Sequence, residues 1–360
     1  MDPIRKVLSY NDSLLVPRHS SLEHLSDANI NFDYFDTMQP FSGPPIINAP
    51  MDKVCSLEMI NKLQEFDIPV TIHRWFKTVE EQIKFYEGCA RTRLKTNKIF
   101  VAVGTLAKWK DWIDKLVSYR TNQKQYFGFL LDIANGDTKA GVETVQYLRQ
   151  ACPSSNIMAG NVATRSGFAR LQEAGANFIR TGIGGSSICQ TRIATGFGLP
   201  TLTSVFDCAK VKDTAYLVAD GGTEYAGDIC KAVAAGADMV MLGKMLAATD
   251  LSAGEKFDRE YNLTENPNEY MYVNYSGMAS REAIQKLASK RNVISVEGVS
   301  GFIRYTGKTE EVVRGIIGNL QAAVSYYAGC RTWEEFRRKV KFVEISPQGW
   351  EESKTRTLER

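Results

Sequence analysis

The sequence predicts a single-domain α/β protein, a (β/α)8 TIM barrel, and two observations carry that prediction. Eight short apolar segments recur along the 360-residue chain, and helical patterns lie between them. Runs of four to eight residues that are apolar on both faces are typical of buried parallel strands. Eight strand–helix units in one continuous pattern favour a closed barrel over a doubly wound open sheet, which is the alternative. No linker rich in proline or serine divides the chain.

The expected elements follow in chain order. The eight strands are expected at 45–51, 68–73, 99–105, 127–134, 157–162, 178–183, 216–221 and 239–243. Helical patterns between them include 56–65, 78–88, 139–151, 165–174 and 226–235. Two further helices, at 311–327 and 332–339, are expected to close the barrel. The domain is thus expected to span 1–347, including an N-terminal segment.

After the last strand comes a segment at about 254–298, in which residues 254–268 are charged and low in apolar content and a polar stretch continues to about 298. A long segment beyond the last strand of a barrel is a candidate lid over the site. The alternative is a solvated surface helix over 281–289. The tail at 348–360 is polar and is expected to be poorly ordered.

Composition excludes several classes of protein. Charged residues make up 24% of the chain and the net charge is only +3, which gives no argument for a nucleic-acid or membrane partner. No apolar run approaches the ~20 residues of a membrane span, and the first residues do not resemble a signal peptide. The seven cysteines form no C-x-x-C pairs, so we expect reduced thiols in a cytoplasmic protein.

Cys189 lies in the most informative segment, a loop rich in glycine and serine at 182–192 that directly follows an apolar run. A cysteine on such a loop is close to several backbone N–H groups, which favour the nucleophilic thiolate. Thr191 lies two residues further on and can move a proton in the same space. The alternative is a buried, inert cysteine beside an ordinary turn.

Polar residues and glycines gather where the strands end, which is where a barrel places its active site. They are Asn48, Met51, Asp52, His73, Arg74, Asp132, Asn135, Gly136, Gly160, Asn161, Asp220, Gly221, Gly222, Gly243 and Lys244. Backbone N–H groups of Gly222, Gly243 and Lys244 suit a phosphate, and Asp220 can accept hydrogen bonds from ribose hydroxyls. The pattern predicts a mononucleotide whose base reaches toward Cys189.

Several blocks in order resemble the IMP dehydrogenase/GMP reductase family over nearly the whole chain. The blocks are 8–17, 43–54, the cysteine loop, 219–222, 241–247, 275–278, and Glu297 with Gly307 ten residues on. The family fold is a (β/α)8 barrel. In both of its branches a cysteine thiolate adds to C2 of a purine. The dehydrogenase passes hydride to NAD and then hydrolyses the intermediate, whereas the reductase releases ammonia and takes hydride from NADPH, which gives IMP.

Three features favour the reductase branch. The blocks at 42–47, 132–136 and 157–162 are similar to the reductase versions. Residues 74–98, between the second and third strands, are too few for the nucleotide-sensing module of dehydrogenases. The stretch 286–293 lacks the Arg–Tyr pair that activates water in the dehydrogenase. The alternatives are a dehydrogenase without the module, which converts IMP and NAD to XMP, and a non-catalytic paralogue that binds purine nucleotides.

The resemblance implies a GMP reductase, an oxidoreductase of purine metabolism that is a homotetramer and uses NADPH, with NADH left open. Its implied catalytic residues are Cys189, Thr191 and Glu297, with Glu297 protonating the leaving amine through Thr191. The implied nucleotide-binding residues are Ser187, Asp220, Gly221, Gly222, Gly243, Lys244, Gly277, Met278 and Ala279. The implied cofactor-binding residues are Arg74, Asp132, Ile133, Ala134, Ile183 and Gly184. A potassium ion is implied at Gly184, Ser186, Cys189 and Arg192.

The chain departs from the family pattern at several of these positions. Gly185 stands in place of a proline, and Ser186 in place of the last glycine of the loop. Gln190 replaces the usual threonine, and Lys244 stands where small residues are usual. Ile294 replaces a lid arginine, and His24-Leu25 replaces a Ser-Arg pair near the cofactor. Potassium dependence, the preferred purine and the choice between NADPH and NADH therefore remain open.

Overall fold

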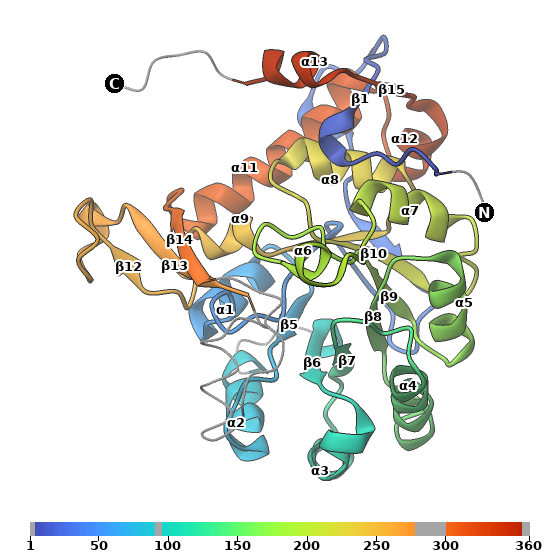
Figure 1. The fold of residues 1–360 in the computed structure, drawn as a ribbon, viewed down its shortest axis with the longest axis vertical. Helices are drawn as coiled ribbons and strands as arrows, with labels where there is room; N and C mark the ends of the chain where they lie inside the picture. The colour runs from blue at the N-terminus through green and yellow to red at the C-terminus, as the bar shows by residue number, and fades with distance from the viewer. Residues whose placement is uncertain (1–3, 91–95, 278–299, 355–360) are drawn as a thin grey trace.

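The computed structural model describes residues 4–90, 96–277 and 300–354, and its centre is a barrel of eight parallel strands (Figure 1). The strands are β4 (Ile46–Asn48), β5 (Val70–Ile72), β6 (Ile99–Val103), β7 (Gly128–Asp132), β8 (Ile157–Val162), β9 (Phe178–Thr181), β10 (Tyr216–Asp220) and β11 (Met239–Leu242). Their order in the sheet is β4-β11-β10-β9-β8-β7-β6-β5, and every pair is parallel. Each lies within one of the eight segments expected from the sequence, so the predicted barrel is confirmed.

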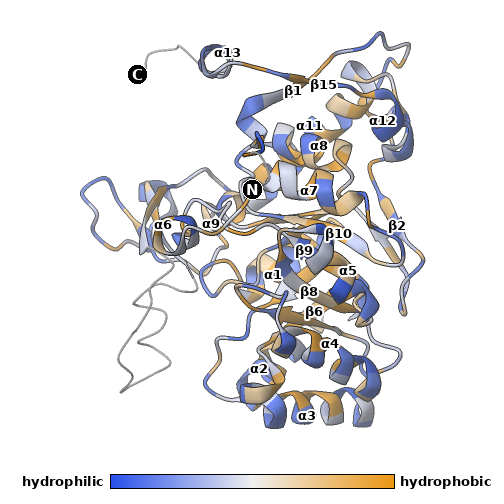
Figure 2. Ribbon diagram, turned by 45° about the vertical axis from the view of Figure 1, so that its right-hand side comes forward, coloured by the Kyte–Doolittle hydropathy of each residue, from blue (hydrophilic) through white to orange (hydrophobic). Residues whose placement is uncertain are grey.

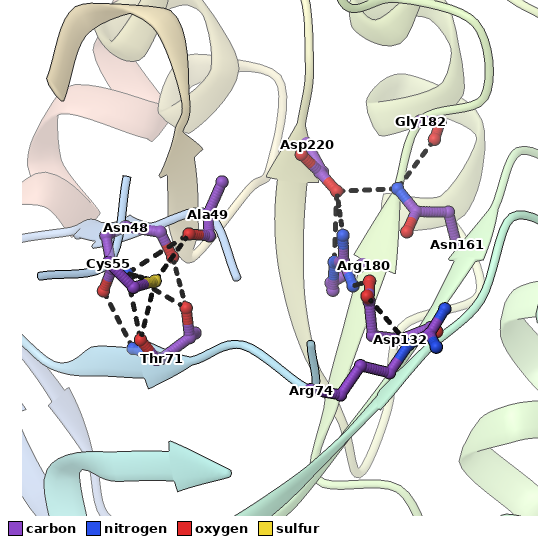
Figure 3. A network of polar contacts seen from close by, with 10 residues as sticks. All are labelled: Asn48, Ala49, Cys55, Thr71, Arg74, Asp132, Asn161, Arg180, Gly182 and Asp220. Atoms are coloured by element: carbon purple, nitrogen blue, oxygen red, sulfur yellow. Dashed lines mark hydrogen bonds and ion pairs between the residues drawn. The ribbon is translucent and has the colours of Figure 1, made fainter. Parts of the chain in front are cut away.

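Asn48 joins the two ends of this sheet and closes the barrel (Figure 3). Its Oδ1 accepts a hydrogen bond from the backbone N–H of Thr71 at 2.8 Å, and its Nδ2 donates to the carbonyl of Thr71 at 3.0 Å. The Thr71 hydroxyl donates to the carbonyl of Asn48 at 2.9 Å. Both residues are fully buried. The side chain of Asn48 therefore makes the hydrogen bonds between β4 and β5 that backbone groups make between the other neighbouring strands. The sheet is closed, and the open-sheet alternative is excluded.

We expect Asn48→Ala to lower the free energy of unfolding by about 2–3 kcal/mol, because it leaves the buried N–H of Thr71 without an acceptor. Chemical denaturation followed by circular dichroism measures the change. Asn274→Ala is the matched control, since Asn274 donates to Glu255 in an exposed position. Equal losses in the two variants would show that the barrel does not depend on the Asn48 bridge.

Helices cover the outside of the barrel, and in Figure 2 the strands are hydrophobic while the outer faces of α2, α3 and α4 are largely hydrophilic. The helices between strands are α1 (Leu57–Glu65), α2 (Val79–Ala90), α3 (Leu106–Asn122), α4 (Lys139–Ala151), α5 (Arg165–Glu173), α6 (Thr191–Thr195), α7 (Thr201–Ala209) and α8 (Ala226–Ala234). Side-chain caps define several starts: the hydroxyl of Ser56 accepts from the N–H of Met59, and that of Thr138 from the N–H of Gly141. The helical patterns expected between strands are confirmed.

Aromatic rings fill the end of the barrel at which the strands begin. The hairpin of β2 (Phe32–Tyr34) and β3 (Phe41–Gly43) brings Tyr34 and Phe41 against Phe178, the first residue of β9. Phe100 of β6 completes the cluster, with its ring centroid 5.4 Å from that of Phe178. All four side chains are buried. A ligand must therefore enter from the opposite end, where the strands terminate.

A strand near the start of the chain pairs with a strand near its end, outside the barrel. Strand β1 (Ser13–Leu15) pairs antiparallel with β15 (Phe342–Glu344). Helix α11 (Thr309–Ala322), the π-helical turn η5 (Ala323–Tyr327) and α12 (Trp333–Lys339) precede β15 and agree with the two expected C-terminal helices. Helix α13 (Pro347–Glu352) follows.

The expectation of poor order from residue 348 onward is wrong for α13. The hydroxyl of Ser346 caps this helix by accepting from the N–H of Gly349 at 3.1 Å. Trp350 packs toward the barrel, with its ring 5.4 Å from Nζ of Lys231 and 6.4 Å from the ring of Tyr225. The polar composition of this segment did not indicate that it forms a capped helix held to the barrel by one tryptophan.

The segment expected to be a lid begins as an antiparallel sheet that projects beside the barrel (Figure 1). Its strands are β12 (Lys256–Phe257), β13 (Tyr272–Ser276) and β14 (Ser300–Arg304), and α9 (Lys244–Ala247) precedes them. The remaining short elements are η1 (Tyr10–Asp12), η2 (Leu25–Asp27), η3 (Thr96–Lys98) and η4 (Pro267–Glu269). The rest of the expected lid, including the alternative helix at 281–289, lies outside the described residues. Within the described part of the chain, no helix has both the length and the apolar character that crossing a membrane requires.

Candidate active site

Two adjoining cavities lie at the end of the barrel where the strands terminate. The first has a volume of about 310 Å³ and the second about 380 Å³. Their common lining residues are Ala49, Met51, Gly185, Ser186, Asp220 and Gly221. Because the cavities share these walls, a ligand in the first reaches the second without crossing the barrel core.

The first cavity is lined by glycines and hydroxyl groups. Gly221 and Gly222 both adopt left-handed conformations, with φ of 90° and 80°, which a residue with a Cβ adopts only under strain. This turn exposes backbone toward the cavity. Among the described residues, the N–H groups of Gly222, Gly243 and Lys244 find no hydrogen-bond acceptor. Unsatisfied N–H groups that converge on a cavity suit an anion such as phosphate.

Lys244 lines the first cavity, but its charge is balanced. Nζ of Lys244 lies 3.0 Å from Oε1 of Glu224, and both side chains are about two-fifths exposed. A pair with that exposure contributes little to stability. The pair therefore leaves Lys244 able to turn toward an anionic ligand at small cost.

Cys189 lines the second cavity and differs from the other six cysteines, all of which are buried. Its Sγ lies 3.2 Å from Oγ1 of Thr191, and its backbone N–H donates to the carbonyl of Ser186 at 3.1 Å. The turn passes through Gly184, whose φ of 78° is again left-handed. The loop thus presents the thiol to the cavity with a hydroxyl in contact.

The second cavity also gathers all the residues expected on the cofactor side. They are Arg74, Asp132, Ile133, Ala134, Ile183 and Gly184. Arg74 is held by the ring of Trp75, 4.5 Å from its guanidinium carbon, and by the ring of Trp109 at 5.4 Å. The lining of this cavity therefore combines apolar residues such as Ile133 and Ile183 with charged residues such as Arg74 and Asp132.

The charged wall is a buried network centred on Arg180 (Figure 3). Arg180 Nη1 lies 2.7 Å from Oδ1 of Asp132, and its Nη2 lies 2.8 Å from Oδ2 of Asp220. Arg74 Nε approaches Oδ2 of Asp132 at 3.4 Å, and Asn161 Nδ2 donates to Asp220 at 2.7 Å. Two arginines and two aspartates make the network neutral. It ties Asp220, which faces the first cavity, to Asp132, which faces the second.

Burial alone would raise the pKa of Asp132. The charges of Arg180 and Arg74 outweigh that effect and hold its pKa below the ordinary value. Asp132 is therefore an acceptor with a full negative charge at neutral pH. The hydrogen bonds to Asp220 all use Oδ2, and Oδ1 has no partner among the described residues.

The structure places most of the expected site residues in these two cavities. Ser187, Asp220, Gly221, Gly222, Gly243 and Lys244 line the first cavity. Cys189, Thr191 and Gly277 line the second, as do the cofactor-side residues. Glu297, Met278 and Ala279 lie outside the described residues. These residues line the same cavities, but what each of them binds or does is a proposal.

The expected potassium residues share the cysteine loop and its following helix. The carbonyl of Ser186 accepts from the N–H of Cys189, and that of Arg192 accepts from the N–H of Gly196. No cluster of three or more histidine, cysteine or acidic side chains that suits a metal occurs in the described part of the chain. A potassium ion held by carbonyl oxygens stays a prediction.

Sequence reasoning missed Arg180, Tyr10 and Thr201 as site residues. Arg180 was visible as a lone charge within the apolar strand 178–183, a position where a charged side chain needs a buried partner. Tyr10 and Thr201 gave no such signal. Both line the first cavity from segments far from the strand ends, so only the folded chain brings them there.

Comparisons with known proteins find relatives over nearly the whole chain. The family model described as IMP dehydrogenase / GMP reductase domain matches residues 7–356. The chain is 31% identical over 352 residues to a GMP reductase of Vibrio atlanticus and 32% identical over 352 residues to one of Shewanella pealeana. It is 32% identical over 346 residues to GMP reductase 2 of Homo sapiens. Each match covers 95% of both chains. The chain therefore belongs to the IMP dehydrogenase/GMP reductase family.

Proposed function

We propose that this chain is a GMP reductase, which converts GMP, NADPH and two protons to IMP, ammonium and NADP⁺. The observation that carries the proposal is the position of Cys189. It is the one cysteine that is not buried, its thiol contacts Thr191, and its cavity adjoins one suited to a phosphate. The relatives named GMP reductase support the same reading.

In the proposed reaction, the thiolate of Cys189 attacks C2 of the purine and forms a covalent bond to it. The amino group on C2 takes a proton from Glu297 by way of Thr191 and leaves as ammonia. When bound, NADPH supplies the hydride that reaches C2. The bond to sulfur then breaks with its electron pair, which regenerates the thiolate and releases IMP. Asp220 holds the ribose, and Gly222, Gly243, Lys244 and Ser187 hold the phosphate.

The residues of the second cavity fit a nicotinamide cofactor. Ile133, Ala134 and Ile183 offer an apolar wall for a flat ring, and charged Asp132 offers an acceptor for ribose hydroxyls. Arg74 and Gly184 complete the wall. NADPH is proposed in preference to NADH, and an assay with each cofactor compares them. Potassium activation, a homotetramer and a cytoplasmic location belong to the same proposal, and assays with potassium or sodium salts and light scattering test the first two.

The two alternative functions give different signals in one absorbance assay at 340 nm. Loss of NADPH with GMP supports the reductase, whereas formation of NADH with IMP supports a dehydrogenase. Nucleotide binding without either signal supports a non-catalytic paralogue. The last two outcomes would each overturn the proposed function.

We expect Thr191→Val to lower kcat for GMP about 10²-fold, at the lower end of what positioned proton transfer contributes. The valine keeps the shape but removes the hydroxyl that lies 3.2 Å from the thiol. KM should change little, because the hydroxyl acts mainly in the transition state. Steady-state kinetics measure both constants.

Thr195→Val is the matched control, because the Thr195 hydroxyl lies one turn further along and donates to the carbonyl of Thr191 on the surface. We expect near-normal kcat for this variant. Glu297→Gln should reproduce the defect of Thr191→Val, and the double variant should be little worse than either single one. Additive losses would contradict a shared proton path.

A further inference from the structure

Thr201 is a buried residue of the first cavity that the proposed mechanism does not use. It is the first residue of α7, only 3% of its surface is exposed, and it lines the cavity. Its Oγ1 has no hydrogen-bond partner among the described residues. A buried hydroxyl without a partner destabilises the fold, so such a group in a cavity indicates a ligand that supplies the partner.

Glycines make room for this hydroxyl. A Cβ on Gly185 would clash with Oγ1 of Thr201. A Cβ on Gly222 would lie 3.6 Å from the same oxygen. Gly185 is also a position at which the loop departs from the family pattern. Gly185 therefore leaves the space that the Thr201 hydroxyl occupies. This hydroxyl lies close to Gly222, in the turn expected to hold phosphate.

Tyr10 brings a second buried hydroxyl to the same cavity. Its side chain is 3% exposed, and its ring lies against Gly222, where a Cβ would be 3.6 Å from Cδ2. Neither its Oη nor Oγ1 of Thr223 forms a regular hydrogen bond with a described residue. Burial, and then the charge of Asp228, raise the pKa of Tyr10 above its ordinary value, although the hydroxyl of Thr223 is close enough to Oη of Tyr10 to lower it by a smaller amount. Tyr10 is therefore a neutral donor at physiological pH.

The surroundings of these hydroxyls favour an anion. Gly222 and Gly243 line the same cavity and their N–H groups have no acceptor among the described residues, and the N-terminus of α7 adds a partial positive charge. Each nearby carboxylate has a cationic partner: Glu224 pairs with Lys244, Oδ2 of Asp220 with Arg180, and Asp228 with Lys231.

We infer that the hydroxyls of Thr201 and Tyr10 donate hydrogen bonds to the 5′-phosphate oxygens of the bound nucleotide. The inference rests on the proposed function, because it takes a purine mononucleotide as the ligand. It assigns two residues, from α7 and from the N-terminal segment, to phosphate recognition beside the glycine turns. The nucleoside part of the ligand makes no contact with either hydroxyl.

Calorimetry on the full-length protein with GMP and with guanosine tests this inference. We expect Thr201→Val and Tyr10→Phe each to weaken GMP binding about tenfold or more, as loss of a hydrogen bond to a charged group does. Guanosine, which lacks the phosphate, should bind as it does to the unsubstituted protein. Thr201→Ser should restore GMP binding. Thr181→Val is the matched control, because Thr181 is equally buried and lines neither cavity.

Unchanged GMP binding in both variants, or equal weakening of GMP and guanosine, would overturn the inference. Failure of the unsubstituted protein to bind GMP would instead overturn the proposed function. In that case inorganic phosphate replaces GMP as the probe, and its effect on the melting temperature of the unsubstituted protein and of each variant is measured. Stabilisation that Thr201→Val removes and Thr181→Val retains supports the inference, and any other result with phosphate contradicts it.

Discussion

Cys189→Ala is expected to abolish turnover of GMP while GMP binding weakens by less than about tenfold, or ~1.4 kcal/mol. The thiol is the group that forms the bond to the purine in the proposed reaction, and among the described residues no other cysteine lines either cavity. The groups proposed to hold phosphate and ribose line the adjoining cavity, which Cys189 does not line. Kinetics at 340 nm and calorimetry measure the two effects separately.

Cys55→Ala is the matched control for this variant. Cys55 also lies near the end of a strand, but it is buried, and burial raises the pKa of its thiol to about 12. Such a thiol is inert at neutral pH, so its variant should keep kcat if the fold tolerates the change. Retained turnover in Cys189→Ala would remove the nucleophile from the proposed mechanism. A mass shift of the intact protein after quenching with GMP, absent from Cys189→Ala, would show the covalent intermediate directly.

The barrel and most of its site could be predicted because they depend on local patterns. Runs such as 99–105 and 127–134 are apolar on both faces, and parallel strands place their carboxyl ends together. That rule alone brings Asp132, Asp220 and Cys189 to one mouth of the barrel. Site residues that lie at or just after the end of a strand can therefore be found from the sequence.

The parts that the sequence concealed depend on contacts between distant segments. The closure of the barrel by Asn48 and Thr71 is a matter of side-chain geometry at the ends of two short strands. Tyr10 reaches the first cavity because Lys231 Nζ donates to its carbonyl and helps to fix the N-terminal segment. Helix α13 is ordered by a cap and one tryptophan within a polar stretch. None of these has a periodic signal.

The second large effect is expected on stability, when Arg180 is replaced. Arg180→Met should lower the free energy of unfolding by about 3–5 kcal/mol, the usual cost of removing one partner from a buried ion pair. The methionine fills similar space, but Asp132 and Asp220 lose the cation that lies 2.7 and 2.8 Å from them. Chemical denaturation at neutral pH measures the loss.

Arg170→Met is the matched control, because Arg170 also makes a close bidentate pair, with Asp137 at 2.6 and 2.7 Å. The Arg170 side chain is half exposed, so the loss should be much smaller than for Arg180→Met. Similar losses for the two arginines would show that burial does not govern the network. Arg180→Met should also raise KM for GMP, since Arg180 holds Asp220 in place.

The pH dependence of Arg180→Met identifies the cause of its loss. In the unsubstituted protein the folded-state pKa of Asp132 lies below its ordinary value of 3.8, so its ionised form stabilises the fold above that pH and the benefit is lost on acidification. Without Arg180, burial outweighs Arg74 and lifts the folded pKa above the unfolded one. The folded variant then binds the proton more tightly than the unfolded chain, and acid favours it. The difference in unfolding free energy between the two proteins should therefore shrink as the pH falls from 8 toward 5. A difference that stays constant over this range would mean that lost packing, and not an uncompensated carboxylate, destabilises the variant.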